Sequence, residues 1–151
     1  MRNLGLVILM SFVLFSCSKN IEPINYGNDQ CEFCRMTIVD QTHAAQVVTN
    51  KGKNFKFDAS ECLIHYLYEQ KNESDMLHVL SADYTNPGIL IDVKDATFII
   101  SQNIPSPMGE NLSAIGSKED AEKIQEENGG ELFSWGDVKV AILADFSKAG
   151  R

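Results

Sequence analysis

The sequence lacks any block of basic residues: 13 Lys and Arg stand against 21 Asp and Glu, and the formal net charge is −8. Proteins that hold nucleic acid or anionic lipid headgroups through charge do so with clustered Lys and Arg. The composition therefore argues against nucleic acid as a partner and against membrane binding through charge. An acidic surface suits a cationic partner or a metal ion, although solubility explains most of the carboxylates.

The chain also lacks a hydrophobic run long enough to span a bilayer. The apolar residues 4–15 are too few, and with the positive Arg2 before them they predict a signal peptide over residues 1–16. Leu14-Phe15-Ser16-Cys17 has the form of a lipobox, so we expect Cys17 to carry the lipid of an envelope protein facing the periplasm or the exterior. The alternative is an ordinary cleaved signal with a chance cysteine. The polar residues 17–30 then predict a flexible tether from the lipidated cysteine.

Cysteine is scarce, and beyond Cys17 its number is odd: Cys31, Cys34 and Cys62 remain. In an oxidising compartment three cysteines cannot form a closed disulfide framework, so at least one is unpaired or metal-bound. At about 135 residues after the signal peptide, the chain suits one domain of ordinary size or two very small lobes that share a core.

Sulfur is nevertheless concentrated in one place, the motif Cys31-Glu32-Phe33-Cys34-Arg35-Met36. Thiolates and thioethers are the ligands that Cu(I) prefers, so the motif predicts a copper site with Cys34, Cys31 and Met36 as candidates. A disulfide between the two cysteines is the main alternative, and a thiol-disulfide enzyme is another. Structural zinc is less favoured. A zinc site needs four ligands, commonly with a second pair, and Cys62 with one histidine matches that spacing only incompletely.

The pattern after this motif predicts a β-hairpin and a helix. Residues 37–49 and 53–57 have strand character around a turn at 51–53. Asp58 is expected to be the N-cap of a helix, with Glu61 three residues later as in a capping box, and apolar residues recur at helical spacing up to residue 70. Strands are expected at 76–82 and 89–93.

The second half repeats this order of elements. Strands are expected at 96–101 and 112–115, a helix between Ser117 and Gly129, a short strand at 131–133 and a last helix after Ser134. The fold class is therefore predicted as α+β, with two small ββα-type lobes in tandem, at about 31–93 and 94–151.

Outside the motif the candidate ligands are fewer. Met108 lies in a loop with Pro105 and Pro107, where a thioether is better placed to bind a soft metal than to fill a core, although packing is the commoner role of a lone methionine. Cys62 falls among apolar residues of the first predicted helix and is expected to be a buried, inert thiol. The three histidines, His43, His65 and His78, do not cluster with the sulfurs in sequence.

Together these residues resemble the NosL family of accessory lipoproteins that supply copper to nitrous oxide reductase. The resemblance rests on the lipobox, on Cys34 and Met36 as a CxM pair, on Phe57-Asp58 at the first helix, on Met108-Gly109, and on Gly129-Gly130 before a short strand. It implies a NosL/MerB-like fold over residues 31–151. Cys34 and Met108 are then the implied Cu(I) ligands, with Met36 as a third, whereas Cys31 is an additional cysteine that leaves open a two-thiolate site or a disulfide.

The predicted function is an envelope lipoprotein that binds Cu(I) and delivers it to the copper-sulfide centre of nitrous oxide reductase, without being an enzyme. A CxxC thiol-disulfide oxidoreductase and a copper-scavenging lipoprotein are the alternatives. The resemblance implies nitrous oxide reductase as a partner, and the lipid anchor implies the membrane. The sequence does not identify the protein that donates the copper.

Overall fold

The computed structural model describes residues 20–70 and 73–149 of the chain. The predicted signal peptide and Cys17 lie outside the described residues. Within these ranges eleven elements follow one another as two β-strands, a helix, a short 3-10 helix, four more strands, a helix, a strand and a last helix. None of the helices in the described ranges is long and apolar enough to cross a membrane.

The first half forms a four-stranded antiparallel sheet in the order β2-β1-β3-β4. Its strands are β1 (Ala45–Thr49), β2 (Asn54–Phe57), β3 (Met76–Ala82) and β4 (Leu90–Asp92). Between β2 and β3 the chain makes α1 (Ser60–Gln70) and the 3-10 helix η1 (Glu73–Asp75).

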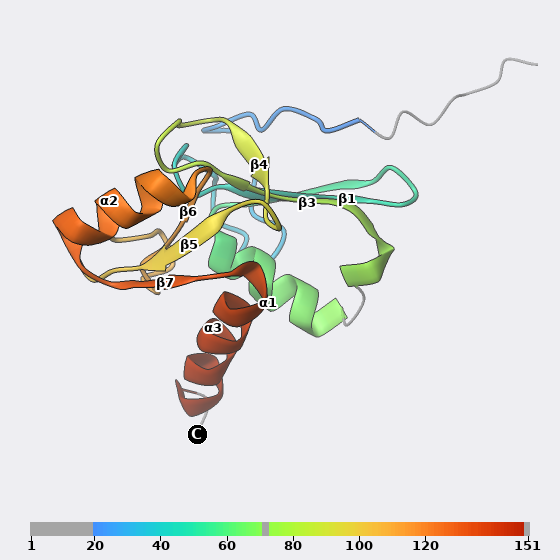
Figure 1. Ribbon diagram of the computed structural model, residues 1–151. Coiled ribbons are helices and arrows are strands. Elements are labelled where there is room, and N and C mark those ends of the chain that lie inside the picture. The colour runs from blue at the N-terminus through green and yellow to red at the C-terminus, as the bar shows by residue number, and fades with distance from the viewer. Residues whose placement is uncertain (1–19, 71–72, 150–151) are drawn as a thin grey trace, which may run out of the picture.

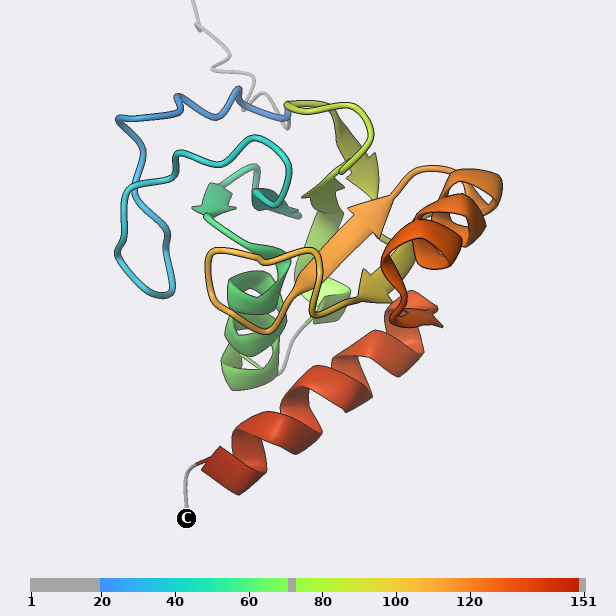
Figure 2. The ribbon, with the colours of Figure 1, turned by 90° about the vertical axis from the view of Figure 1, so that its left-hand side faces the viewer.

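The second half forms a three-stranded antiparallel sheet in the order β6-β5-β7. Its strands are β5 (Thr97–Ile100), β6 (Leu112–Ile115) and β7 (Glu131–Phe133). Helix α2 (Lys118–Asn128) covers this sheet, and α3 (Trp135–Ala149) runs from its edge past α1, as Figures 1 and 2 show. The α+β class with two antiparallel sheets is thus confirmed.

One hydrophobic core joins the two sheets. It contains buried residues of β1 and α1 from the first half and of β5, β6 and α3 from the second, and Cys31 and Cys62 belong to it. A parallel bridge between Asp83 and Ala114 links the sheets directly. A side chain in the first half can therefore contact a loop of the second.

The predicted strand at 37–49 is wrong over its first part. Thr37 makes only an isolated bridge with Gln30, and β1 begins at Ala45 after a turn at residues 41–43. The reason lies in Asp40, whose carboxylate accepts hydrogen bonds from the backbone N–H and the hydroxyl of Thr42. Such a local side-chain bond offers the backbone a turn in place of a sheet ladder.

The described part of the predicted tether is bound to the fold. The Lys56 ammonium donates to the carbonyl oxygen of Pro23 at 2.8 Å and to the Asp29 carboxylate at 2.6 Å. The Gln46 amide donates to the carbonyl of Glu22, and the side chain of Ile24 packs against the core. Residues 20–30 therefore lie along the first sheet and are not a free linker.

Candidate metal centre

The CxxCxM motif folds into a closed turn just before the first sheet. The backbone N–H of Cys31 donates to the carbonyl of Met36 at 2.8 Å, and the N–H of Arg35 donates to the carbonyl of Cys31 at 3.0 Å. Arg35 has a φ of 66°, in the left-handed region that costs a non-glycine residue of order 1 kcal/mol. The two hydrogen bonds hold this conformation, which turns the chain back after Cys34.

A second segment meets this turn at the end of β2. The N–H of Glu32 donates to the carbonyl of Lys56 at 2.8 Å, which fixes the turn beside the residues that follow β2. Asp58 comes directly after β2, and Cys62 lies four residues later in the first turn of α1. Residues four apart at a helix start share one face, so both side chains point toward the turn.

The expected capping box at the start of α1 is wrong. The Asp58 carboxylate is only 3% exposed and accepts no hydrogen bond from a backbone N–H of α1, because it faces the thiols of Cys31 and Cys62. Glu61 does not reach back to cap the helix either, because its carboxylate accepts hydrogen bonds from Ser106 and from the backbone N–H of Leu112. Local spacing predicts that both acids cap the helix, but tertiary contacts hold their carboxylates elsewhere.

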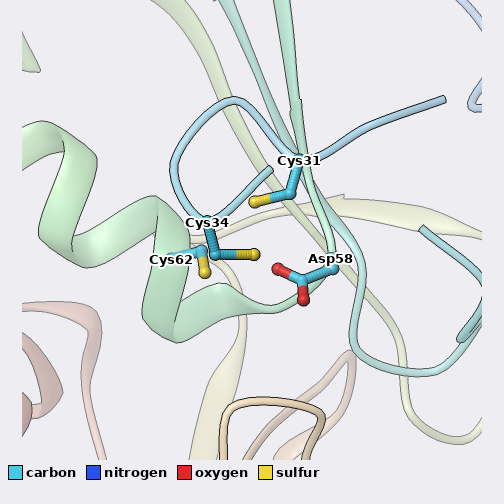
Figure 3. A group of neighbouring side chains, drawn as sticks. All are labelled: Cys31, Cys34, Asp58 and Cys62. Carbon is cyan, nitrogen blue, oxygen red and sulfur yellow. The ribbon is translucent and has the colours of Figure 1, made fainter. Parts of the chain in front are cut away.

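Four side chains from these segments converge, as Figure 3 shows: Cys31, Cys34, Asp58 and Cys62. We call them the sulfur cluster. Taking one ligand atom from each, all lie within 4.8 Å of one another. The three cysteines are free thiols. Cys31 and Cys62 are fully buried and Cys34 is half-buried, so the cluster is reached from the side of Cys34.

The sulfurs influence one another's protonation. A hydrogen bond from the Cys62 thiol lowers the pKa of Cys31 to about 6, and the same contact raises the pKa of Cys62. Burial raises the pKa of Cys34 to about 11. The cluster thus favours one thiolate, on Cys31, stabilised by a neighbouring thiol.

The two predicted methionine ligands lie in different settings. Met36 is 47% exposed and follows Cys34 by two residues, so its side chain lies at the protein surface. Met108 lies in the loop between β5 and β6 and is partly buried against the core that contains Cys31 and Cys62. The structure therefore brings Cys31 and Cys34 together, whereas Met36 is exposed at the end of the CxxCxM turn and Met108 packs against the core from another loop.

The loop of Met108 is held against α1 by a second group of side chains, Glu61, His65, Ser106 and Glu110, which we call the polar cluster. Ser106 donates to the Glu61 carboxylate and accepts from the N–H of Asn111 at 2.9 Å. His65 Nε2 lies 3.1 Å from Glu110 Oε1. Figure 2 shows the loop lying beside α1. These contacts hold the loop that carries Met108 in place beside α1.

The histidines lie outside the sulfur cluster. His43 is buried, with Nδ1 at 2.9 Å from the Asp40 carboxylate and Nε2 at 3.1 Å from the Ser113 hydroxyl. His65 stacks on Phe33 of the CxxC turn, with ring centroids 5.6 Å apart. His78 is half-buried in β3. Within the described residues, sulfur atoms and one carboxylate are therefore the donors of the candidate centre.

Sequence reasoning missed two members of the cluster, Cys62 and Asp58. We expected Cys62 to be inert and Asp58 to cap the helix, yet the structure places both beside Cys31 and Cys34. Their four-residue spacing at a predicted helix N-terminus could have revealed the pair, because both then share one face at the end where the helix dipole stabilises anions.

Comparison with known proteins gives a family and a solved structure. A family model described as NosL matches residues 24–143. The crystal structure of the copper chaperone NosL from Shewanella denitrificans is similar, with a TM-score of 0.66 and 22% sequence identity, over 76% of this chain and 92% of that chain. At this identity the likeness shows the fold. No curated protein matches this chain.

Proposed function

We propose a function for this chain from the premise that it belongs to the NosL family. It binds one Cu(I) ion at the sulfur cluster and passes the ion to another protein, so it is a copper carrier and not an enzyme. Membership of the family supports this role, as does the shared fold with a protein described as a copper chaperone.

One observation carries the proposal: three free cysteine sulfurs gather within 4.8 Å of one another in a largely buried site. Cu(I) takes soft thiolate and thioether ligands in preference to oxygen and nitrogen. The buried position of Cys31 and Cys62 limits the access of water and of competing ligands. The donor set thus suits Cu(I) better than harder cations such as Mg²⁺ or Ca²⁺.

The three cysteines have different parts in this proposal. Cys34 is half-buried and is the ligand that first meets the incoming ion. Cys31, whose pKa is lowered by the Cys62 thiol, supplies a thiolate at neutral pH, and Cys62 lies behind it as a third sulfur. Met36 and Met108 supply thioethers, of which the exposed Met36 can contact a receiving protein while Cys34 still holds the copper.

The same geometry makes thiol-disulfide exchange the weaker alternative. An exchanging cysteine needs an accessible thiolate of low pKa. Here these two properties fall on different residues, because Cys34 has the greater access but a raised pKa, while Cys31 has the lowered pKa but is fully buried. A copper scavenger would use the same site as a carrier and differ only in retaining the ion.

We propose the cell envelope as the place of action, with Cys17 as the lipid attachment site. The recipient that the resemblance implies is the copper-sulfide centre of nitrous oxide reductase. The acidic chain, with a net charge of −8, remains a poor partner for nucleic acid.

A competition titration tests copper binding. The reduced protein is titrated under nitrogen against a Cu(I) chelator, and we expect one tightly held Cu(I) per chain. Cys34→Ser is expected to lower the Cu(I) affinity by more than about 100-fold. Such a loss exceeds the roughly 10- to 100-fold loss expected when a residue that only supports the ligands is replaced. Glu32→Gln, in the same turn, is the control and should leave the affinity unchanged. An unchanged affinity in Cys34→Ser would remove Cys34 from the site.

A transfer experiment separates carrier from scavenger. Copper-loaded protein is mixed with purified apo-nitrous oxide reductase, and the two are separated and assayed for copper. Delivery predicts that copper moves to the reductase faster than it moves to buffer containing a chelator of the same affinity. Retention of copper under both conditions would favour the scavenger.

A further inference from the structure

The segment that leads back to Cys17 is fixed to the fold almost up to that residue. The Asn54 amide donates to the carbonyl of Asn20 at 3.1 Å, and the Asn54 side-chain oxygen accepts from the N–H of Glu22 at 3.2 Å. The Cα atoms of Cys17 and Asn20 are three residues apart in the sequence, so at most about 11 Å separates them. A lipid on Cys17 therefore holds this side of the fold close to the bilayer surface.

A groove lies on the same side, between this segment and the loop before β4. Figures 1 and 2 show residues 20–26 beside the loop of residues 84–89. The groove has a volume of about 460 Å³. Glu22 and Gly88 contribute to its lining, and the other lining residues are apolar or aromatic: Ile21, Pro23, Ile24, Tyr26, Ile89 and Leu90. We call it the apolar groove.

Two isoleucines of the apolar groove are exposed to solvent. Ile21 is 46% exposed and Ile89 is 58% exposed, although burial of a large aliphatic side chain is favourable. They come from segments far apart in the sequence, so folding alone brings them to one surface. Exposed apolar surface of this kind marks contacts with a protein or with a membrane.

The charges around the apolar groove exclude binding through anionic headgroups. Among its lining residues the charged one is Glu22, and none is Lys or Arg. Attraction to anionic lipids depends on Lys and Arg near the surface. A bilayer contact at the apolar groove must therefore come from burial of apolar side chains at the boundary between headgroups and acyl chains. Tyr26 suits that position, because amphipathic aromatic rings are enriched at the membrane interface.

A second copy of the chain is the other candidate occupant of the apolar groove, and the short connection to Cys17 favours the bilayer. A contact that is linked to an existing anchor becomes intramolecular, with an effective concentration set by the length of the linker. Here the linker is only the few residues between Cys17 and the bound segment. A second copy must instead be met by diffusion.

We propose that the apolar groove is a second, non-covalent membrane contact, in which Ile21 and Ile89 enter the interface of the bilayer beside the lipid of Cys17. The contact depends on the proposed lipid attachment and adds to it, because a lipid alone permits many orientations of the fold and the groove selects one. The apolar groove and the sulfur cluster share no residue, so the contact leaves the cluster to a receiving protein.

The test uses the full acylated chain in phosphatidylcholine vesicles, with and without bromine on the acyl chains. Bromine quenches tryptophan fluorescence only at short range, so it reports contact with the lipid. Ile89→Trp places an indole at the apolar groove. Val140→Trp is the matched control, because Val140 is 69% exposed on α3, which extends from the opposite side of the molecule in Figures 1 and 2. The signal of Trp135 is common to all samples and is subtracted.

We expect brominated lipid to lower the added fluorescence of Ile89→Trp by at least about twofold and to leave that of Val140→Trp nearly unchanged. The quenching should be the same at low and high salt, because salt screens charges and not apolar contacts. Equal quenching of the two variants would overturn the proposal, and so would its loss at high salt. A blue shift that depends on protein concentration and not on bromine would also overturn it, in favour of a second copy.

Two further measurements separate the membrane contact from the proposed function. Mass spectrometry that finds no lipid on Cys17 would remove the anchor and the groove contact together and leave the Cu(I) titration to decide copper binding. Acylated, copper-binding protein without quenching at Ile89→Trp would overturn the groove contact alone. Quenching in a chain that binds no Cu(I) would support the contact and remove the carrier role. Circular dichroism checks that Ile89→Trp is folded, and if it is not, Ile21→Trp is the second variant, with the same quenching expected.

Discussion

The sulfur cluster and the polar cluster both lie beside α1, but they differ in the hydrogen-bond partners of their side chains. In the polar cluster Glu61 and Glu110 each have a protein partner for at least one oxygen, Ser106 for the first and His65 for the second. In the sulfur cluster the three cysteines form no disulfide, and the side chains of Cys62 and Asp58 find their partners within the cluster itself.

This difference distinguishes a ligand-binding site from a group of structural contacts. Buried polar atoms normally find partners, and groups that do so hold segments together. Buried ligand atoms that converge and contact one another, without holding two segments together through a fixed set of partners, are instead available to an ion. The polar cluster should therefore matter mainly for the stability of the fold, and the sulfur cluster mainly for metal affinity. Variants in the Met108 loop and in the CxxCxM motif test whether these two roles are separate.

The largest expected effect is that of Ser106→Ala on stability. The change removes the donor to Glu61 and the acceptor for the Asn111 N–H, so a buried carboxylate and a part-buried N–H each lose a partner. We expect the free energy of unfolding to fall by about 1 to 3 kcal/mol, measured by urea denaturation of the metal-free protein. Gln102→Ala, at an exposed position of the same loop, is the control. Equal stability of the two variants would mean that the polar cluster does not hold the loop.

Met108→Leu is expected to have the next largest effect. Leucine keeps the volume but has no sulfur, so Cu(I) affinity should fall about tenfold, or about 1.4 kcal/mol, while stability changes by less than about 1.5 kcal/mol. Met76→Leu is the matched control, because Met76 is also partly buried against the same core. If both variants bind Cu(I) equally well, Met108 is a packing residue and the division between the clusters becomes sharper.

Met36→Leu should have the smallest effect. Its side chain is half exposed, so we expect unchanged stability within about 0.5 kcal/mol and a Cu(I) affinity within about threefold of the unmodified chain. The effect should appear in the rate of copper transfer to a receiving protein, measured by stopped-flow mixing. Val39→Ala, another exposed apolar position nearby, is the control. A transfer rate equal to that of the control would leave Met36 without a part in transfer.

Much of the fold could be predicted from local patterns. The strands β3, β6 and β7 lie where their alternation or short apolar runs place them, and Ser117 caps α2 by accepting from the N–H of Asp120, as its spacing predicts. These features depend on residues close together in the chain. The strand expected at 37–49 failed in part because Asp40 forms a turn through contacts that alternation does not reveal.

The candidate site could be predicted only in its local half. Cys31 and Cys34 share one turn, so their proximity follows from three residues of separation. Cys62 looked like a core thiol because its neighbours are apolar, and it is indeed buried in the core. Its proximity to the sulfurs of Cys31 and Cys34 could not be predicted. That proximity depends on the backbone hydrogen bond between Glu32 and Lys56, which holds the CxxC turn beside β2.

The sequence by itself determined the chemistry of this protein: soft sulfur donors in a CxxCxM turn, an acidic chain without basic blocks, and the order of strands and helices. These follow from residue type and short spacing. Only the tertiary structure decided that Cys62 and Asp58 join the turn and that residues 20–30 bind the sheet. The physical reason is that these contacts join segments more than twenty residues apart, which are brought together by the shared core and by backbone hydrogen bonds between segments.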